Sequence, residues 1–191
     1  MLRDKIATFE KVSEDQYITD CLKMRSDLVS ATICADEYAK IKIPSRATSG
    51  SVGFDFYLPM DIHLLPGQVI LIPTGIRCKM EEGYSLDIYP KSGLGFNNFT
   101  TIANTVGIID SDYYYSSNEG HIIVKLINKG FDIKYSGKLT GIHSVESDLV
   151  RKQGQSFVQG IFHECFGATN DNDAEMSVRN GGFDSTNKTN N

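Results

Sequence analysis

The sequence predicts an all-β core of the barrel or jelly-roll type, preceded by a helical segment and followed by a polar tail. Short apolar stretches alternate with turn signals from about residue 41 to residue 166, no helical pattern interrupts them, and the apolar content falls after Gly167. Many short strands without intervening helices are typical of such folds. A chain of 191 residues is long enough for one sizeable core and short for two full domains.

The first segment (1–40) is expected to form a helical extension. Ser13 followed by Gln16 resembles a capping box, in which two residues satisfy each other's backbone N–H groups at the start of a helix. Apolar side chains then recur at helical spacing, at Tyr17, Cys21, Met24 and Leu28. Because an apolar stripe usually faces a core, we expect it to pack on the barrel, and binding of a protein partner is the alternative.

The central segment (41–167) is expected to hold the strands. The clearest candidates lie at 68–73, 84–89, 100–104, 121–128 and 156–164. Turn residues at 66–67 and 81–83 stand where hairpin turns would be expected. The last segment (168–191) ends in Gly, Asn, Ser and Thr, so we expect a flexible arm that orders only when it closes on a ligand.

Composition narrows the function. The formal net charge of −5 disfavours a nucleic-acid binder, whose affinity would come from Lys and Arg neutralising phosphates. No apolar run is long enough to span a bilayer and no secretory leader is recognisable, so the cytoplasm is the expected location and no membrane partner is expected. The cysteines are far apart, which fits reduced thiols better than a disulfide framework or a zinc site: Cys21, Cys34, Cys78 and Cys165.

One short segment has the composition of a site. If Val106–Ile109 is a buried strand end, strand alternation sends Asp110 and Asp112 to the same face, and Tyr113 opens the turn beside them. A solvated turn is the alternative for an Asp-x-Asp sequence on its own.

Four further motifs lie in a fixed order around this segment, at 51–55 (SVGFD), 89–95 (YPKSGLG), 154–162 (GQSFVQGIF) and 179–186 (RNGGFDST). Together the five motifs resemble those of the homotrimeric dUTPase family, over roughly residues 42–187. The resemblance implies a distorted jelly-roll β-barrel and a homotrimer with active sites shared between subunits. It also implies hydrolysis of dUTP to dUMP and pyrophosphate with Mg²⁺, which keeps uracil out of DNA and supplies dUMP for dTTP synthesis.

The resemblance assigns roles to the carboxylates and to the sugar and base contacts. Asp110 matches the residue that positions and activates the attacking water, a role a carboxylate within hydrogen-bond reach can perform. Asp55 matches the residue that holds Mg²⁺ through water. Tyr113 matches the aromatic residue that packs under deoxyribose, where a ribose 2′-hydroxyl would collide. Asn104 matches a residue that contacts uracil.

The phosphate contacts come from the second and fourth motifs. By resemblance Lys91, Ser92 and Gly93 bind phosphate together with Gln159. Lys91 stands where the family usually has Arg, which removes a bidentate fork but keeps a positive charge suited to phosphate.

The carboxy-terminal motif implies a lid over the site of a neighbouring subunit. Phe183 would stack on uracil, and three polar residues would hold the γ-phosphate: Arg179, Ser185 and Thr186. Asp184 replaces the usual Gly after the Phe, and an extra carboxylate near a triphosphate should weaken the lid.

Two alternatives remain beside dUTP hydrolysis. The sister activity, dCTP deamination, would need a catalytic Glu near Lys125, which cannot serve as that carboxylate. A dUTPase-like regulatory protein would instead use nucleotide binding to control an unidentified protein partner, through the amino-terminal helix or the inserted residues 114–119.

Overall fold

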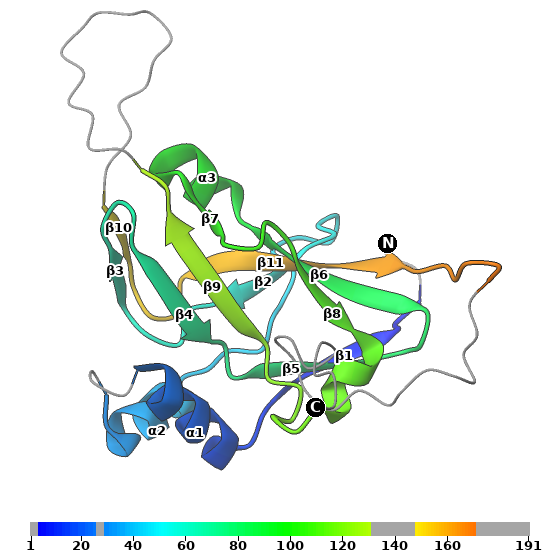
Figure 1. Ribbon diagram of the computed structural model, residues 1–191, viewed down its shortest axis with the longest axis horizontal. Coiled ribbons are helices and arrows are strands. Elements are labelled where there is room, and N and C mark those ends of the chain that lie inside the picture. Colours follow the sequence, from blue (N-terminus) through cyan, green and yellow to red (C-terminus); the bar gives the residue numbers. More distant parts are fainter. Residues whose placement is uncertain (1–3, 26–28, 131–147, 171–191) are drawn as a thin grey trace, which may run out of the picture.

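The computed structural model describes residues 4–25, 29–130 and 148–170 (Figure 1). In chain order its elements are β1 (Ala7–Lys11), α1 (Glu14–Arg25), α2 (Ala31–Ala39), β2 (Phe54–Tyr57), β3 (Ile62–Leu64), β4 (Val69–Pro73), β5 (Ile76–Met80), β6 (Tyr84–Pro90), α3 (Ser92–Asn98), β7 (Thr100–Ile102), β8 (Gly107–Asp110), the 3₁₀ helix η1 (Ser111–Tyr115), β9 (Ile123–Asn128), β10 (Leu149–Arg151) and β11 (Ser156–Glu164). No helix within these described ranges is long and apolar enough to cross a membrane.

The strands pair antiparallel in two larger sheets and two strand pairs. The larger sheets have the orders β2-β11-β6-β8 and β4-β9-β7, and the pairs are β1-β5 and β10-β3. Buried side chains of both larger sheets, such as Leu86 and Leu126, belong to one apolar cluster. The predicted all-β core is therefore confirmed.

The four-stranded sheet has one apolar and one polar face, because side chains alternate along each strand. Leu86, Ile88 and Val158 lie in the core. The other face carries two rows of paired residues, Asp55–Gln159–Tyr89 at one end and His163–Ser85–Asp110 at the other. This polar face carries three of the predicted site residues, Asp55, Gln159 and Asp110.

The predicted strands fall on β4, β6, β7, β9 and β11, but the predicted hairpins are wrong. Turns do occur at both positions, with Gly67 at φ +79° and Gly83 at φ +83°, conformations that suit glycine. The strands on either side of each turn pair with different partners, β3 with β10 and β4 with β9 in one case. The chain crosses between sheets at these turns, as it does in sandwich-like folds.

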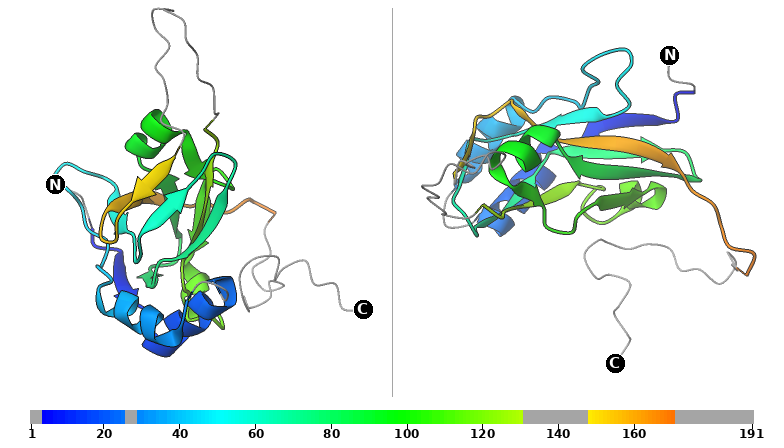
Figure 2. Two further views of the ribbon diagram at one scale, coloured as in Figure 1. Left: turned by 90° about the vertical axis from the view of Figure 1, so that its left-hand side faces the viewer. Right: turned by 90° about the horizontal axis from the view of Figure 1, so that it is seen from above.

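The amino-terminal segment is not purely helical. Residues Ala7–Lys11 form a strand that pairs with β5, and two helices follow it, packed side by side near the end of β4 (Figure 2). Tyr17 and Cys21 are fully buried in the core, so the prediction that this stripe packs on the barrel is confirmed for them. Leu28 lies outside the described residues.

The predicted capping box is only half formed. Ser13 Oγ accepts a hydrogen bond from the backbone N–H of Gln16 at 3.2 Å, as expected. The reciprocal bond is absent, because the Ser13 N–H donates to Glu119 at 2.8 Å while the Gln16 side chain donates to Asp20. Glu119, from the inserted residues 114–119, thus accepts the Ser13 N–H that the capping-box pattern assigns to Gln16.

Candidate functional site

Three of the five motifs meet at one end of the polar face. Lys91 Nζ donates to Asp55 Oδ2 at 2.8 Å and to Ser156 Oγ at 3.1 Å. Gln159 lies opposite Asp55 in the β2–β11 register, and its side chain fills the space beside Gly53, where a Cβ atom would lie 2.6 Å from Gln159 Oε1. Glycine in the first motif therefore leaves room for the Gln159 side chain.

Ser92 and Gly93 begin the helix α3, although the sequence predicts no helix between residues 41 and 166. Lys91 is the N-cap residue of α3, and the buried Leu94 anchors the first turn to the core. The backbone N–H of Lys91 donates to Phe157 O at 3.2 Å, which ties the start of α3 to β11. Ser92 is exposed beside Lys91 at the end of the face that carries Asp55 and Gln159.

Asp110 lies at the opposite end of the polar face. It ends β8, an edge strand, and is exposed opposite Ser85 of β6. The expectation of a buried strand end is wrong, because the edge strand leaves Ile108 63% exposed. The strand also stops before Asp112, which lies in η1, so strand alternation does not place the two carboxylates on one face.

Hydrogen bonds to two neighbouring residues hold the buried side chain of Tyr113. It is 7% exposed, its hydroxyl donates to His121 O at 2.9 Å, and it accepts a hydrogen bond from Asn118 Nδ2 at 2.9 Å. Asn104 lies in the exposed turn before β8, next to Thr105, which has a positive φ of 69°.

The two ends of the polar face are well separated within the chain. Gln159 lies opposite Tyr89, whereas Asp110 lies opposite Ser85 on the same strand. At a rise of about 3.3 Å per residue these positions on β6 are roughly 13 Å apart. A water bound to Asp110 is therefore too far from Gln159 of the same chain for both to contact one phosphate group.

A row of polar side chains along β6 joins the two ends and was not predicted from the sequence: Ser85, Asp87 and Tyr89. Ser85 Oγ donates to Asp87 Oδ1 at 2.9 Å, and Tyr89 Oη and His163 Nε2 lie 3.3 Å apart. Loss of hydration and the nearby Asp87 carboxylate raise the pKa of Tyr89. The alternation of Ser85, Asp87 and Tyr89 along a predicted strand was the available signal for this row.

The predicted lid residues lie outside the described residues. They are Arg179, Phe183, Ser185 and Thr186, together with Asp184.

Asp55 offers the chemistry that an outer-sphere magnesium site requires. Mg²⁺ keeps several waters and takes its other oxygen ligands from substrate phosphates, so a single carboxylate beside residues expected to bind phosphate is a suitable donor set. Asp55 is half-buried, and Lys91 already neutralises one of its oxygens. The residues present therefore fit Mg²⁺ held through water and not a cage made by the protein alone.

A second group of potential metal ligands lies in the helical pair. Among the residues that the structure describes, one atom from each of Cys21, Cys34 and Glu37 lies within 4.8 Å of the others. Both oxygens of Glu37 accept hydrogen bonds from Arg25, at 2.7 and 3.0 Å, and burial raises the pKa of Cys21 to about 12. A guanidinium already occupies the position beside the carboxylate, and protonated thiols are poor ligands, so this cluster is better suited to packing than to a metal.

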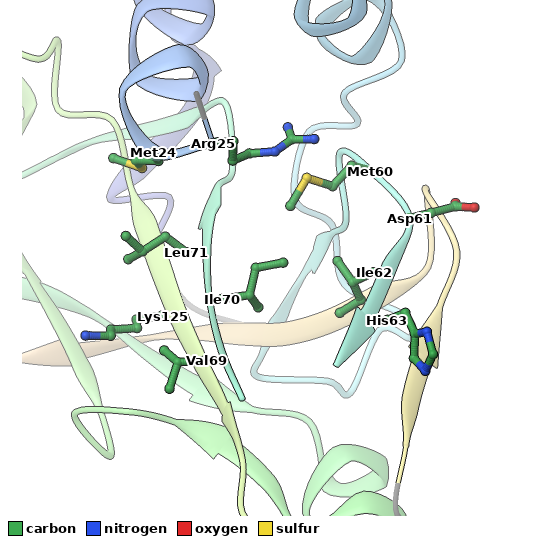
Figure 3. Close-up of a pocket in the computed structure, with 10 residues that line it drawn as sticks. All are labelled: Met24, Arg25, Met60, Asp61, Ile62, His63, Val69, Ile70, Leu71 and Lys125. Carbon is green, nitrogen blue, oxygen red and sulfur yellow. The ribbon is translucent and has the colours of Figure 1, made fainter. Parts of the chain in front are cut away.

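A cavity of about 470 Å³ lies away from the predicted site, between the end of α1 and strands β3 and β4. Figure 3 shows Ile62 and Ile70 pointing toward each other across it, whereas Lys125 points away. Its lining is mainly apolar and its Arg25 is paired with Glu37. Because a triphosphate needs free cations and N–H donors, we place no nucleotide here.

Comparisons with known proteins agree with the arrangement of the motifs. The sequence model of the dUTPase family matches residues 39–138. A deoxyuridine 5′-triphosphate nucleotidohydrolase of Lactococcus lactis is 33% identical over 149 residues, covering 78% of this chain and 89% of that protein. One from Brucella melitensis is 43% identical over 101 residues, covering 50% of this chain and 61% of that protein.

Solved structures share the fold. The dUTPase of Streptococcus mutans matches with a TM-score of 0.57 at 23% identity, covering 85% of this chain and 98% of its own. A Staphylococcus bacteriophage 80alpha dUTPase with dUpNHpp matches with a TM-score of 0.59 at 14% identity, covering 91% and 99%. A dUTPase from phage phi11 of S. aureus, described with a structural Mg(II) ion, has a TM-score of 0.57 at 16% identity, covering 90% and 99%. The predicted jelly-roll type is confirmed, and on its motifs, its fold and these matches the chain belongs to the dUTPase family.

Proposed function

We propose that this protein is a cytoplasmic dUTP diphosphatase that hydrolyses dUTP to dUMP and pyrophosphate, limits uracil incorporation into DNA and supplies dUMP for dTTP synthesis. The observation that carries the proposal is the meeting of Asp55, Lys91 and Gln159 at one end of the polar face, in a chain of the dUTPase family. Relatives named deoxyuridine 5′-triphosphate nucleotidohydrolase support the substrate.

The phosphate end binds the triphosphate. Lys91 supplies a positive charge, Ser92 a hydroxyl, Gly93 a close backbone approach, and Gln159 an amide. Asp55 would hold Mg²⁺ through water, and the ion would supply neutralisation of phosphate charge. Lys91 already pairs with Asp55 at 2.8 Å, so the amine is poised beside the carboxylate before substrate arrives.

Asp110 acts as the general base. Its carboxylate takes a proton from a water whose oxygen attacks the α-phosphorus. The bond between the α-phosphorus and the oxygen bridging to the β-phosphate then breaks, and pyrophosphate leaves. Tyr113 packs under the deoxyribose, and Asn104 contacts uracil beside it. The contacts to uracil and to the phosphates form before the chemical step. Positioning of the substrate therefore supplies much of the rate enhancement.

The site is shared between subunits of a homotrimer. Asp110 and Gln159 stand at opposite ends of one chain's polar face, roughly 13 Å apart along β6. In the trimer, Asp110 of a second chain lies close to Lys91 and Gln159 of the first chain, so one site contains all three residues. Residues 168–191 form the arm that closes each site, with Arg179, Ser185 and Thr186 on the γ-phosphate and Phe183 on uracil.

Pyrophosphate release tests the activity. We expect rapid release from dUTP with Mg²⁺, far slower release from dCTP, dTTP and UTP, and loss of activity in protein truncated after Ser177. Tight dUTP binding without release would contradict hydrolysis and favour the regulatory alternative. Ammonia release from dCTP would contradict it in favour of deamination.

Mixing two defective variants tests the sharing. Asp110→Asn and Lys91→Ala chains, each weak alone at low dUTP, are combined, dissociated and reassembled. If the two residues come from different chains, some sites in mixed trimers contain both native side chains and activity returns. If both come from one chain, no mixed assembly regains activity. Light scattering on the same samples measures the oligomeric state.

A further inference from the structure

The amino-terminal strand and helix are joined to the segment that follows Tyr113. Ser13 donates from its backbone N–H and from Oγ to the two carboxylate oxygens of Glu119, at 2.8 and 2.7 Å. The two residues are 106 positions apart in sequence, and Glu119 belongs to the inserted residues 114–119. The extension and the insertion therefore contact each other directly.

A second contact lies deeper, in the core. His121 Nδ1 lies 2.6 Å from Asp20 Oδ2, and the His121 side chain is fully buried. The backbone N–H of Gly75 donates to His121 Nε2 at 2.8 Å, so Nε2 must be the unprotonated nitrogen and Nδ1 carries the proton that is donated to Asp20. Burial alone would raise the pKa of Asp20, but the hydrogen bonds from His121 and Gln16 outweigh it and lower this pKa.

A third contact fixes the start of the insertion. Tyr114 Oη donates to Glu10 Oε2 at 2.8 Å, and Arg77 pairs with the same carboxylate at 2.9 Å. The Arg77 guanidinium also lies over the Tyr114 ring, 4.6 Å from its centroid. Glu10 belongs to β1, so strand and helix hold opposite ends of the same short segment.

These contacts converge on Tyr113. Its hydroxyl donates to the backbone oxygen of His121, whose ring is held by Asp20. The chain returns from η1 to β9 so tightly that a Cβ atom on Gly120, at φ +70°, would lie 2.6 Å from Tyr114 Cα. Because this segment is so tightly packed, we expect a displacement of His121 or Glu119 to displace Tyr113.

We propose that Glu10, Ser13 and Asp20 are positioning residues that hold Tyr113 against the sugar and so set the preference for deoxyribose over ribose. This inference rests on the proposed function, because it gives Tyr113 the role of the sugar contact. The three residues need not touch the substrate. They act by holding the segment 113–121 in one place, since a misplacement of about 1 Å at a substrate-positioning group can lower the rate by ~100-fold.

The test compares Asp20→Ala with Asp20→Asn and Arg25→Ala in the full chain. Asp20→Ala removes the acceptor for His121, Asp20→Asn retains an acceptor oxygen, and Arg25→Ala breaks a different contact of α1, the ion pair with Glu37. Arg25 contacts no residue of the segment 113–121 in these hydrogen bonds, so it is the matched control for loss of helix stability alone. Ser13→Ala is the milder second variant, should Asp20→Ala fail to fold.

We expect the ratio of kcat/KM for dUTP to that for UTP to fall by about tenfold or more in Asp20→Ala, less in Ser13→Ala, and to be restored largely by Asp20→Asn. Arg25→Ala should leave the ratio unchanged. A ratio unchanged in both Asp20→Ala and Ser13→Ala would overturn the inference, as would an equal fall in Arg25→Ala.

Hydrogen exchange separates this inference from the proposed function. Peptides covering residues 111–122 should exchange faster in Asp20→Ala and Ser13→Ala than in the native protein and in Arg25→Ala, with no nucleotide present. Hydrogen exchange can be measured even if the native protein fails to hydrolyse dUTP. That failure would overturn the proposed function and leave the positioning role to be judged by exchange. Unchanged exchange over 111–122 in both variants would overturn the positioning role.

Discussion

The two ends of the polar face are held in different ways. The end with Asp55, Lys91 and Gln159 is called the phosphate end, after its proposed role. There, backbone pairing of neighbouring strands fixes Asp55 and Gln159, and the junction of β6 and α3 fixes Lys91. The end with Asp110 and Tyr113 is called the sugar end, also after its proposed role. There, Asp110 lies on an edge strand and Tyr113 in a 3₁₀ helix held by side chains from β1 and α1. Substitutions at the first end should therefore act through the charge that binds phosphate. At the second end, Asp110 should act through proton acceptance, and the residues around Tyr113 through its position.

The largest effect is expected at the sugar end, from Asp110→Asn. An amide cannot accept the proton of the attacking water, so turnover should fall by roughly 10²–10⁴-fold. Binding of dUTP should persist, since removing a negative charge near a triphosphate does not weaken attraction. Stopped-flow pyrophosphate release and calorimetric dUTP titration measure the two properties.

Asp112→Asn is the matched control for that substitution. Asp112 is also exposed but lies in η1, where strand alternation does not align it with Asp110. Its removal should leave turnover within a few fold. Comparable losses in both variants would contradict the assignment of Asp110 as the base.

At the phosphate end, Lys91→Ala should raise the KM for dUTP by about 10- to 100-fold. The substitution removes a charge-assisted contact to phosphate and leaves the half-buried Asp55 without the ion pair at 2.8 Å. Lys91→Arg should retain most of the affinity, because the charge remains. Initial rates over a range of dUTP concentrations separate KM from kcat.

The control at this end is Lys152→Ala, which breaks an exposed ion pair with Asp61 elsewhere on the surface. Exposed pairs contribute little, so neither KM nor stability should change measurably. A rise in KM equal to that of Lys91→Ala would mean that overall charge, and not the site, attracts the nucleotide.

A smaller loss is expected from Gly120→Ala, which tests the compactness of the sugar end. The added Cβ would meet the backbone of Tyr113 and Tyr114 at 2.6 to 3.0 Å, in a positive-φ conformation. Strain and crowding of this kind cost about 1–3 kcal/mol of unfolding free energy. Urea unfolding measures this loss. Gly67→Ala is the control, because Gly67 also has a positive φ but has open space around it, so this variant measures the cost of backbone strain alone. Equal losses in the two variants would show that crowding contributes nothing.

The sequence predicted the strands that lead to Lys91 and carry Gln159, but not the contacts around Tyr113. Strand periodicity predicts β6 and β11, and pairing of β11 with β2, a strand that the sequence did not predict, then brings Asp55 beside Gln159. The contacts of Ser13, Asp20 and Glu10 span 106, 101 and 104 positions and depend on side-chain geometry that no periodic pattern carries. Short strands such as β3 and β10 were missed because three residues are too few to show alternation.

The smallest effect is expected in the pH dependence of stability. Glu119 has its pKa lowered below the ordinary value of 4.5, chiefly because Ser13 donates to it from its hydroxyl and its backbone N–H. A carboxyl with a lowered folded-state pKa contributes stability that is present above its unfolded pKa and is lost as the pH falls through the folded value. The native protein should therefore lose part of its unfolding free energy below about pH 4.5.

Ser13→Ala removes the hydroxyl donor but keeps the backbone N–H, so its loss of stability on acidification should be shallower. Urea unfolding at intervals between about pH 6 and pH 3 measures both slopes. Thr48→Ala, which removes an exposed hydroxyl bonded to Ser51 and not to a carboxylate, should keep the native slope. Because Glu119 is partly exposed, the difference will be small, and identical slopes in Ser13→Ala and the native protein would show that the Ser13 hydroxyl does not stabilise the ionised carboxylate.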